Sequence, residues 1–243
     1  IYVLSAAFRL MKQAAAAQNP AMGAGPTLTD VVIGTSWGHG WLIGIIGAAL
    51  VLPGFSLAKR NVAVGTPIAL TGGLAMVLSP ALSGHAAAGS PFILAVSLDA
   101  VHIATVGAWL GCLFVVLTVG VPTMLRVTDG NPDAAVGALV NSFHPIALLA
   151  PPLTILAGAG SAVLRLGSLS ALSSDYGMTL AWKVGVALLV AGAGAYNSTR
   201  ARRRLGNPEG TRSLRRSAMI ELGLAALVLA ITTVLVSTAV PGE

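Results

Sequence analysis

Long apolar runs are the feature that most constrains this chain. Six stretches approach or exceed the roughly 20 residues that an α-helix needs to cross the hydrocarbon core of a membrane. In lipid, backbone polar groups must be satisfied within the protein, so only helices and closed barrels can span it. The runs are continuous in Ala, Leu, Val and Gly rather than alternating, so they predict helices. The predicted spans are Trp41 to Ala58, Val62 to Leu82, Pro91 to Val121, Phe143 to Leu164, Met178 to Thr199 and Leu214 to Val240.

Charged residues are scarce, which agrees with a membrane location. They make up 9% of the chain, whereas soluble domains carry roughly 25%. We therefore predict an all-α, polytopic transmembrane helical bundle that forms a single membrane domain over residues 1–243, with about six full spans. Residues 1–18 add a partial or interfacial helix, because Arg9 and Lys12 interrupt an apolar run. The chain begins at Ile1 rather than Met, so we expect it to begin inside a longer protein.

The basic residues predict the orientation of the bundle. Ten of the fourteen lysines and arginines fall in or directly beside three connectors, and short basic connectors stay in the cytoplasm. Residues 200–213 form the most basic connector and are predicted to be a cytoplasmic loop, whereas residues 19–40 are predicted to be an exoplasmic loop with a short amphipathic piece. Because this pattern accounts for the net charge of +6, we expect membrane lipids and not nucleic acid as partners.

Three ionisable side chains are predicted to lie near the exoplasmic boundary. Asp99 and His102 are three residues apart, so they share one helix face, and the carboxylate can orient the imidazole. His85 ends the preceding span, and a short turn brings it back beside the next one. A charged group inside hydrocarbon costs roughly 2.5–3.5 kcal/mol at a helix centre, so such groups usually serve a function.

This pattern indicates a metal site in which His85 and His102 are ligands and Asp99 is an orienting group or a ligand. Imidazole suits copper, zinc, iron and nickel, and a nearby thioether such as that of Met76 favours Cu(I). His39, in the segment WGHGW, is a second accessory candidate, although its Trp neighbours favour a role as an interfacial anchor. The alternative is an Asp99–His102 pair that only stabilises the bundle, with His85 in solvent. Spacing alone leaves both open.

A b-type haem is a further alternative, because haem needs axial ligands on facing helices. His102 and His144 are the candidate pair. Their predicted depths differ, since His144 lies near the cytoplasmic end of its helix, and we therefore expect no haem.

Glu221 lies near the cytoplasmic end of the last span. We expect it to pair with Arg215 or Arg216, which are close to it in sequence. This pairing would be structural.

Glycines four residues apart predict close packing between helices within the bundle. Examples are Gly40 with Gly44 and Gly107 with Gly111.

Several motifs together resemble the copper resistance D (CopD) family of bacterial inner-membrane proteins. They are SGHA at 83–86, D-x-x-H-x6-W-L-G from Asp99 to Gly111, VLRLGSLSAL, Tyr176–Gly177 followed by Lys183, Asn197 before the basic loop, LRRSAMIEL with Glu221, and a terminal VST with Pro241. The chain departs from the family in three places: an N-terminal helix is missing or truncated, WLGC replaces WLGG, and SFHP replaces an Arg-Phe-Ser stretch.

The resemblance implies a multi-pass protein of the bacterial plasma membrane that takes up copper or supplies it to cuproproteins, with exoplasmic histidines as ligands. The leading hypothesis is therefore a copper-handling permease, served by a periplasmic copper carrier. A structural subunit of a larger membrane complex, such as an oxidase or photosynthetic complex, is the alternative from another class. No GxSxG, Walker, HExxH or CxxC motif is present, so we expect no enzymatic activity.

Overall fold

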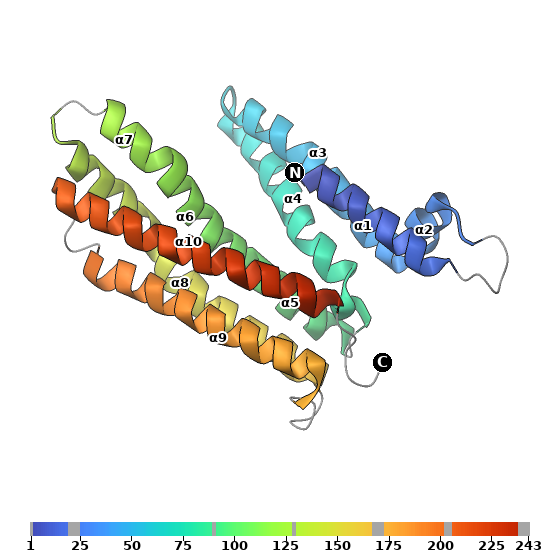
Figure 1. Ribbon diagram of the computed structural model, residues 1–243. Helices are drawn as coiled ribbons and strands as arrows, with labels where there is room; N and C mark the ends of the chain where they lie inside the picture. Colours follow the sequence, from blue (N-terminus) through green and yellow to red (C-terminus); the bar gives the residue numbers. More distant parts are fainter. Residues whose placement is uncertain are drawn as a thin grey trace. The chain divides into compact units, whose positions relative to one another are not determined.

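The helical architecture predicted from the apolar runs is confirmed (Figure 1). The computed structural model describes residues 2–18, 25–88, 91–127, 130–166, 173–201 and 206–237, and these residues contain helices and no strand. Within the described residues, six helices are long and apolar enough to cross a membrane. The chain divides into two compact units, residues 1–100 and 101–243, and the single membrane domain remains a prediction.

The first unit is built on a hairpin of two long helices. They are α3 (Ser36–Ala58) and α4 (Val62–Leu82), and a 3-10 segment, His85–Ala88, follows α4. Small residues let the two backbones approach: a side chain at Gly47 would meet the carbonyl oxygen of Gly72 at 2.6 Å, and one at Gly54 would meet the backbone nitrogen of Ala69 at 2.5 Å. This contact is the close packing that small residues permit between membrane helices.

The N-terminal helix packs on this hairpin. It is α1 (Tyr2–Ala17), and the indole N–H of Trp41 donates to the backbone carbonyl of Ala6 at 2.9 Å. The Arg9 guanidinium donates to the Ser83 hydroxyl at 2.9 Å. Arg9 is therefore hydrogen-bonded to the residue that caps the C-terminal end of α4.

The predicted exoplasmic loop over residues 19–40 contains more helix than expected. A short helix, α2 (Leu28–Gly34), begins with a capping box in which Thr27 and Asp30 bond each other's backbone N–H. Thr35 then caps α3, its hydroxyl accepting from the N–H of Gly38 at 3.0 Å. The first span consequently begins at Ser36 instead of Trp41, and the segment WGHGW is helical. Residues 19–24 of the predicted loop lie outside the described residues.

The first helix of the second unit is long and begins before residue 101. Its α-helical parts are α5 (Phe92–Val106), α6 (Cys112–Val115) and α7 (Val121–Val127). Two π-helical segments, Gly107–Gly111 and Val116–Gly120, join these parts without interrupting the helix. A π segment widens the turn by one residue and is frequent at functional sites.

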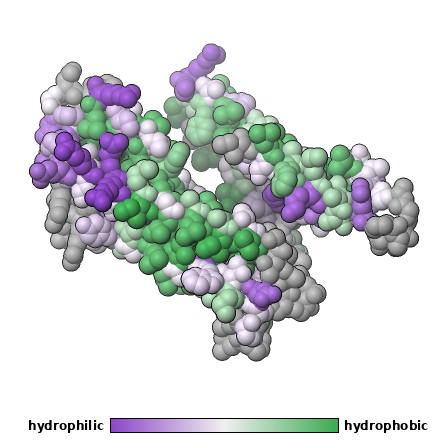
Figure 2. Space-filling model, viewed as in Figure 1, coloured by the Kyte–Doolittle hydropathy of each residue, from purple (hydrophilic) through white to green (hydrophobic). Residues whose placement is uncertain are grey.

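Three more helices complete the second unit. They are α8 (Pro132–Leu166), α9 (Asp175–Tyr196), which ends in a π-helical segment Asn197–Ala201, and α10 (Pro208–Ser237). Figure 2 shows apolar surface over the middle of α10 and hydrophilic residues where α10 begins. Large apolar side chains on α10, among them Met219, Ile220 and Leu229, are exposed, as expected for helices that face lipid.

Helices α8 and α10 both begin earlier than the hydropathy pattern predicts. Each starts with Asn-Pro followed by an acidic residue: Asn131 and Asn207 cap the helices, accepting from the N–H groups of Ala134 at 3.0 Å and Gly210 at 2.8 Å. Asn is a favoured cap and Pro is favoured at the first helical position. The basic connector predicted over 200–213 is therefore helical from Pro208, while residues 202–205 lie outside the described residues.

The predicted packing role of the glycine pairs holds for one pair and fails for the other. Side chains added at Gly40 and Gly44 would meet atoms of other helices within 3 Å, and the Ser79 hydroxyl lies against position 44. A side chain added at Gly107 or Gly111 would meet nothing within 4 Å. Both of these glycines are exposed, so this pair makes no close contact with the helices that the structure describes.

Candidate functional site

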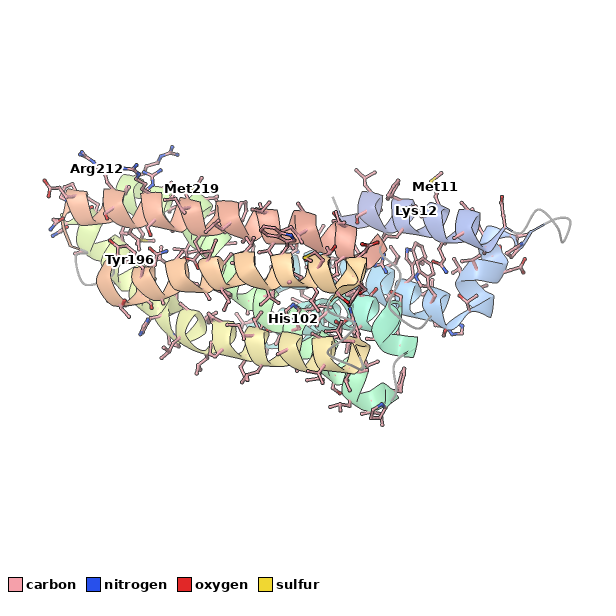
Figure 3. The ribbon with its side chains drawn as sticks, turned by 60° about the horizontal axis from the view of Figure 1, so that its bottom comes forward. Met11, Lys12, His102, Tyr196, Arg212 and Met219 are labelled. Atoms are coloured by element: carbon pink, nitrogen blue, oxygen red, sulfur yellow. The ribbon has the colours of Figure 1, made fainter. Side chains whose placement is uncertain are left out.

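His102 is the predicted site residue whose surroundings the structure describes best. It lies on α5, half-buried, and Figure 3 shows it among the helices of the second unit. Its Nδ1 atom lies 2.9 Å from the backbone carbonyl oxygen of Thr154 on α8. A side chain at Gly158, one turn further along α8, would lie 3.0 Å from both Cε1 and Nδ1 of the ring. The missing side chain at Gly158 is what lets the imidazole reach α8.

This contact selects one tautomer of the neutral His102 ring. A carbonyl oxygen can only accept a hydrogen bond, so Nδ1 carries the proton and the lone pair is on Nε2. Donation from Nδ1 to a backbone carbonyl is a common arrangement for a histidine that binds a metal through Nε2. The Thr154 carbonyl therefore orients the imidazole of His102, and the role of His102 as a metal ligand with Asp99 beside it remains a prediction.

A second hydrogen bond joins α5 and α8 beside His102. The Thr154 hydroxyl donates to the Thr105 hydroxyl at 2.8 Å, and the Thr105 hydroxyl lies 2.8 Å from the carbonyl of Val101, to which it donates. Thr154 therefore holds α5 through both its backbone and its side chain. Since this pairing fixes the backbone around residue 102, it limits where the imidazole can lie.

The remaining members of the predicted metal site stay predictions. Asp99 lies on α5 three residues before His102 and is half-buried. His85 begins the 3-10 segment, but its side chain is outside the described residues. Among the described side chains, no group of three or more His, Cys, Asp and Glu could hold a metal ion together.

The two accessory candidates belong to the first unit. His39 lies within α3, exposed, and its Nε2 is 2.8 Å from the backbone carbonyl of Ile33 on α2. Because this contact joins two consecutive helices, it is consistent with the anchoring role that its Trp neighbours indicate. Met76 is half-buried within α4. A role for either as a copper ligand remains a prediction.

A second polar cluster lies in the second unit, and the sequence did not predict it. Glu221 on α10 is 2% exposed. Its Oε1 accepts a hydrogen bond from the indole N–H of Trp109 at 3.0 Å, and its Oε2 accepts from the Asn197 amide at 2.6 Å. Both donors come from π-helical segments, Gly107–Gly111 and Asn197–Ala201. Gly194 allows the approach, since a side chain there would lie 3.0 Å from Oε1 of Glu221.

The expected pairing of Glu221 with Arg215 or Arg216 is wrong. Both arginines are exposed, whereas Glu221 is buried. At 3.6 residues per turn, residues five and six positions earlier point roughly 120–140° away around the helix. One signal in the sequence could have indicated the true environment: Glu221 is the sole acidic residue in the last apolar run.

The Glu221 cluster borders a cavity of about 40 Å³. This volume is enough for one or more water molecules, which need roughly 10–15 Å³ each. His144 on α8 lines the cavity together with Trp109, Asn197 and Glu221, and the other walls are mainly apolar. The Oδ1 atom of Asn197 is buried and has no hydrogen-bond partner among the described residues.

The geometry does not support a haem held between His102 and His144. His102 lies against Thr154 and Gly158, whereas His144 precedes Thr154 by ten residues on the same helix. That spacing corresponds to about 15 Å along the axis of an α-helix. Two axial ligands must bind one iron atom from opposite sides, so these two positions are too far apart.

The chain was also compared with known protein families. Residues 137–235 match the family model described as Copper resistance protein D (CopD). The matched segment contains His144, Thr154, Gly158, Asn197 and Glu221, so it includes residues of both polar regions. Comparison with curated proteins and with solved structures gives no match.

Proposed function

We propose that the chain is a copper-handling permease that takes up or supplies copper across the bacterial plasma membrane. The proposal starts from the match of residues 137–235 to the CopD family model, which supports a CopD family protein. Copper is the transported substrate in this proposal. It is bound on the exoplasmic side by His102 and His85, with Asp99 as a ligand or orienting group, and then passes between the helices.

The arrangement of His102 is the observation that carries the proposal. The hydrogen bond from Nδ1 to the Thr154 carbonyl places the lone pair of the neutral ring on Nε2. Imidazole nitrogen is a good ligand for copper. The ring is half-buried on a membrane-spanning helix, where an ionisable side chain is costly and usually serves a function.

Asp99 and His85 are the other two proposed ligands, because Asp99 lies close to His102 in the sequence and His85 lies shortly before the start of its helix. Asp99 is one helical turn before His102 on α5. His85 begins the short segment after α4, and α5, which carries Asp99, follows from Phe92. Two imidazoles and a carboxylate could bind copper while leaving room for exchange with an incoming carrier.

Copper binding by the purified protein tests this assignment. The protein in lipid nanodiscs is loaded with Cu(I) under oxygen-free reducing conditions, or with Cu(II), and the bound copper is measured by elemental analysis after desalting. His102→Ala and His85→Ala should lower the affinity by more than the 10–100-fold that loss of a ligand's hydrogen-bond partner usually costs. Ser97→Ala, an exposed change on the same helix, should bind copper like the unchanged protein.

Cellular copper provides the transport measurement. Cells that depend on this protein should lose copper accumulation with His102→Ala at unchanged membrane levels of the protein. Wild-type affinity and unchanged cellular copper in this variant would overturn the proposal. Copurification with stoichiometric protein partners and no bound copper would favour the structural-subunit alternative, and a Soret absorption band would favour a haem protein.

Gly158 offers a test of the positioning of His102. Gly158→Ala adds a methyl group 3.0 Å from two ring atoms, so the imidazole must shift. We expect about a tenfold loss of copper affinity, with bound copper still detectable at high concentration. Gly107→Ala, which meets nothing within 4 Å, is the matched control on the helix that carries His102.

A further inference from the structure

The cavity beside Glu221 has the features of a site that binds a proton. Glu221 is almost completely buried in a membrane-spanning helix, yet its hydrogen bonds within the described part of the chain come from two neutral donors, the Trp109 indole and the Asn197 amide. A buried carboxylate without a cation is costly, and such groups generally take up a proton instead. The two N–H donors stabilise the carboxylate, whereas burial favours the protonated carboxyl group, so each protonation state is stabilised by one feature of the site.

The unsatisfied oxygen of Asn197 is an independent sign of a ligand. The Asn197 side chain is 9% exposed, its amide nitrogen donates to Glu221, and its Oδ1 has no partner among the described residues. A buried acceptor without a donor costs about 1–3 kcal/mol. A donor in the cavity, such as a water molecule or a protonated group, would satisfy this oxygen.

The other titratable side chain that lines this cavity is His144. It faces the cavity from α8, and the long helix contributes Trp109 and apolar side chains. The π-helical segment after α9 contributes Asn197 and Ser198. On α10 itself Arg215 and Arg216 are exposed. The cavity therefore contains one carboxyl group and one imidazole, the pair most suited to proton transfer near neutral pH.

We propose that Glu221 is an intramembrane proton-binding site whose proton exchanges with His144 through the cavity that both residues line. In the exchange the O–H bond of the Glu221 carboxyl breaks and an N–H bond forms on the unprotonated ring nitrogen of His144, with water in the cavity as the bridge. The pair changes from two neutral groups to a carboxylate and an imidazolium, and the total charge in the cavity is conserved.

A proton fits this site better than a metal ion. Both carboxylate oxygens already accept a hydrogen bond from an N–H group. Among the described residues, no three or more His, Cys, Asp and Glu side chains are grouped so that they could hold a metal ion. Most of the cavity wall is apolar, including Leu113, Val116 and Leu117. The site also does not depend on copper, because none of its residues is a proposed copper ligand.

Infrared difference spectroscopy on the copper-free protein tests the proposal directly. The full chain in lipid nanodiscs is titrated with acid and base, and the carbonyl stretch of protonated carboxyl groups is followed. We expect a band that changes with pH and is lost in Glu221→Gln, a variant of nearly the same shape. Glu209→Gln, the same change in the exposed first turn of α10, should keep the band.

Two further measurements keep the test decisive if Glu221→Gln folds poorly. Trp109→Phe removes the donor to Oε1, so the band of the Glu221 carboxyl should move in frequency. His144→Ala should slow hydrogen–deuterium exchange of that carboxyl by a factor of about ten or more, since it removes an acid–base partner. A wild-type protein without a titrating band, or a band unchanged in Glu221→Gln, would overturn the proton site, and unchanged exchange in His144→Ala would overturn the role of His144.

Discussion

Two polar regions of the second unit are held together in different ways. At His102, one side chain contacts the backbone of a neighbouring helix, and the adjacent Gly158 leaves space for the ring. At Glu221, three side chains from α10, the long helix and the end of α9 are joined by two buried hydrogen bonds. The first arrangement orients a ring against a backbone carbonyl, while the second makes helix packing depend on a carboxyl group. Substitutions at Glu221 should therefore lower the stability of the bundle more than substitutions at His102, the proposed ligand site.

The largest effect is expected from Glu221→Ala. The change leaves the Trp109 indole and the Asn197 amide without their acceptor. Two orphaned donors should lower the free energy of unfolding by about 2 kcal/mol, at the low end of the usual range because unfolded helices in a membrane find other partners. Unfolding in mixed micelles measures it, with Glu209→Ala as the exposed control. If Glu221→Ala lowered the free energy of unfolding no more than Glu209→Ala, the Glu221 hydrogen bonds would not stabilise the bundle.

A matched pair of glycines tests how tightly the Glu221 region is packed. Gly194→Ala places a methyl group 3.0 Å from Oε1 of Glu221 and 3.1 Å from a ring carbon of Trp109, whereas Gly192→Ala meets nothing within 4 Å. We expect Gly194→Ala to cost about 1 kcal/mol of unfolding free energy through overpacking. Gly192→Ala should be neutral or slightly stabilising, because Ala is the better helix former. The same unfolding assay compares them, and equal effects would mean that the carboxyl group moves aside freely.

A smaller loss of stability is expected from His102→Ala. The hydrogen bond to the Thr154 carbonyl is removed, but the Thr105–Thr154 hydroxyl pair still joins the same helices. The free energy of unfolding should fall by about 0.6 kcal/mol, the average for hydrogen bonds between membrane helices. The unfolding assay in mixed micelles measures this loss. If His102→Ala destabilised the protein as much as Glu221→Ala, the distinction between a ligand site and a packing site would fail.

The smallest effect concerns Asp30, a carboxylate outside the predicted spans, which gives a reference for titration in water. Hydrogen bonds from the hydroxyl and the backbone N–H of Thr27 hold the pKa of Asp30 below its ordinary value. A lowered pKa in the folded state means that the cap stabilises α2 above the ordinary carboxyl pKa and is lost as the pH falls through the lowered value. Amide hydrogen exchange in α2 should therefore speed up in acid, without change in the spans. Asp30→Asn should show no such acid dependence.

The sequence predicted the spans well but placed several helix starts too late. Hydropathy finds the apolar part of a helix, and α3, α8 and α10 extend beyond it through the polar caps Thr35, Asn131 and Asn207. The Asn-Pro-acidic pattern at α8 and α10 was visible in the sequence. Caps of this kind, rather than hydropathy, decide where such helices begin.

The two polar regions differ in how far the sequence could predict them. His102 was identified because a histidine and an acid share a helix face, which is a local pattern. Its contact to the Thr154 carbonyl was not predictable, since every residue has a backbone carbonyl and this one lies 52 residues away. The partners of Glu221 are 112 and 24 residues away in the chain. Local spacing favoured the neighbouring arginines, whereas helix packing brought in Trp109 and Asn197.

The π-helical segments have a consequence for the geometry of the long helix. Trp109 lies in a turn that holds one residue more than an α-helical turn. If that extra residue were absorbed into regular α-helix, everything on one side of the turn would rotate by about 100° relative to the other side. His102 precedes this turn, and the wall of the Glu221 cavity formed by Leu113 and Leu117 follows it. The one extra residue in this turn therefore sets the angle, around the helix axis, between His102 and this wall of the cavity.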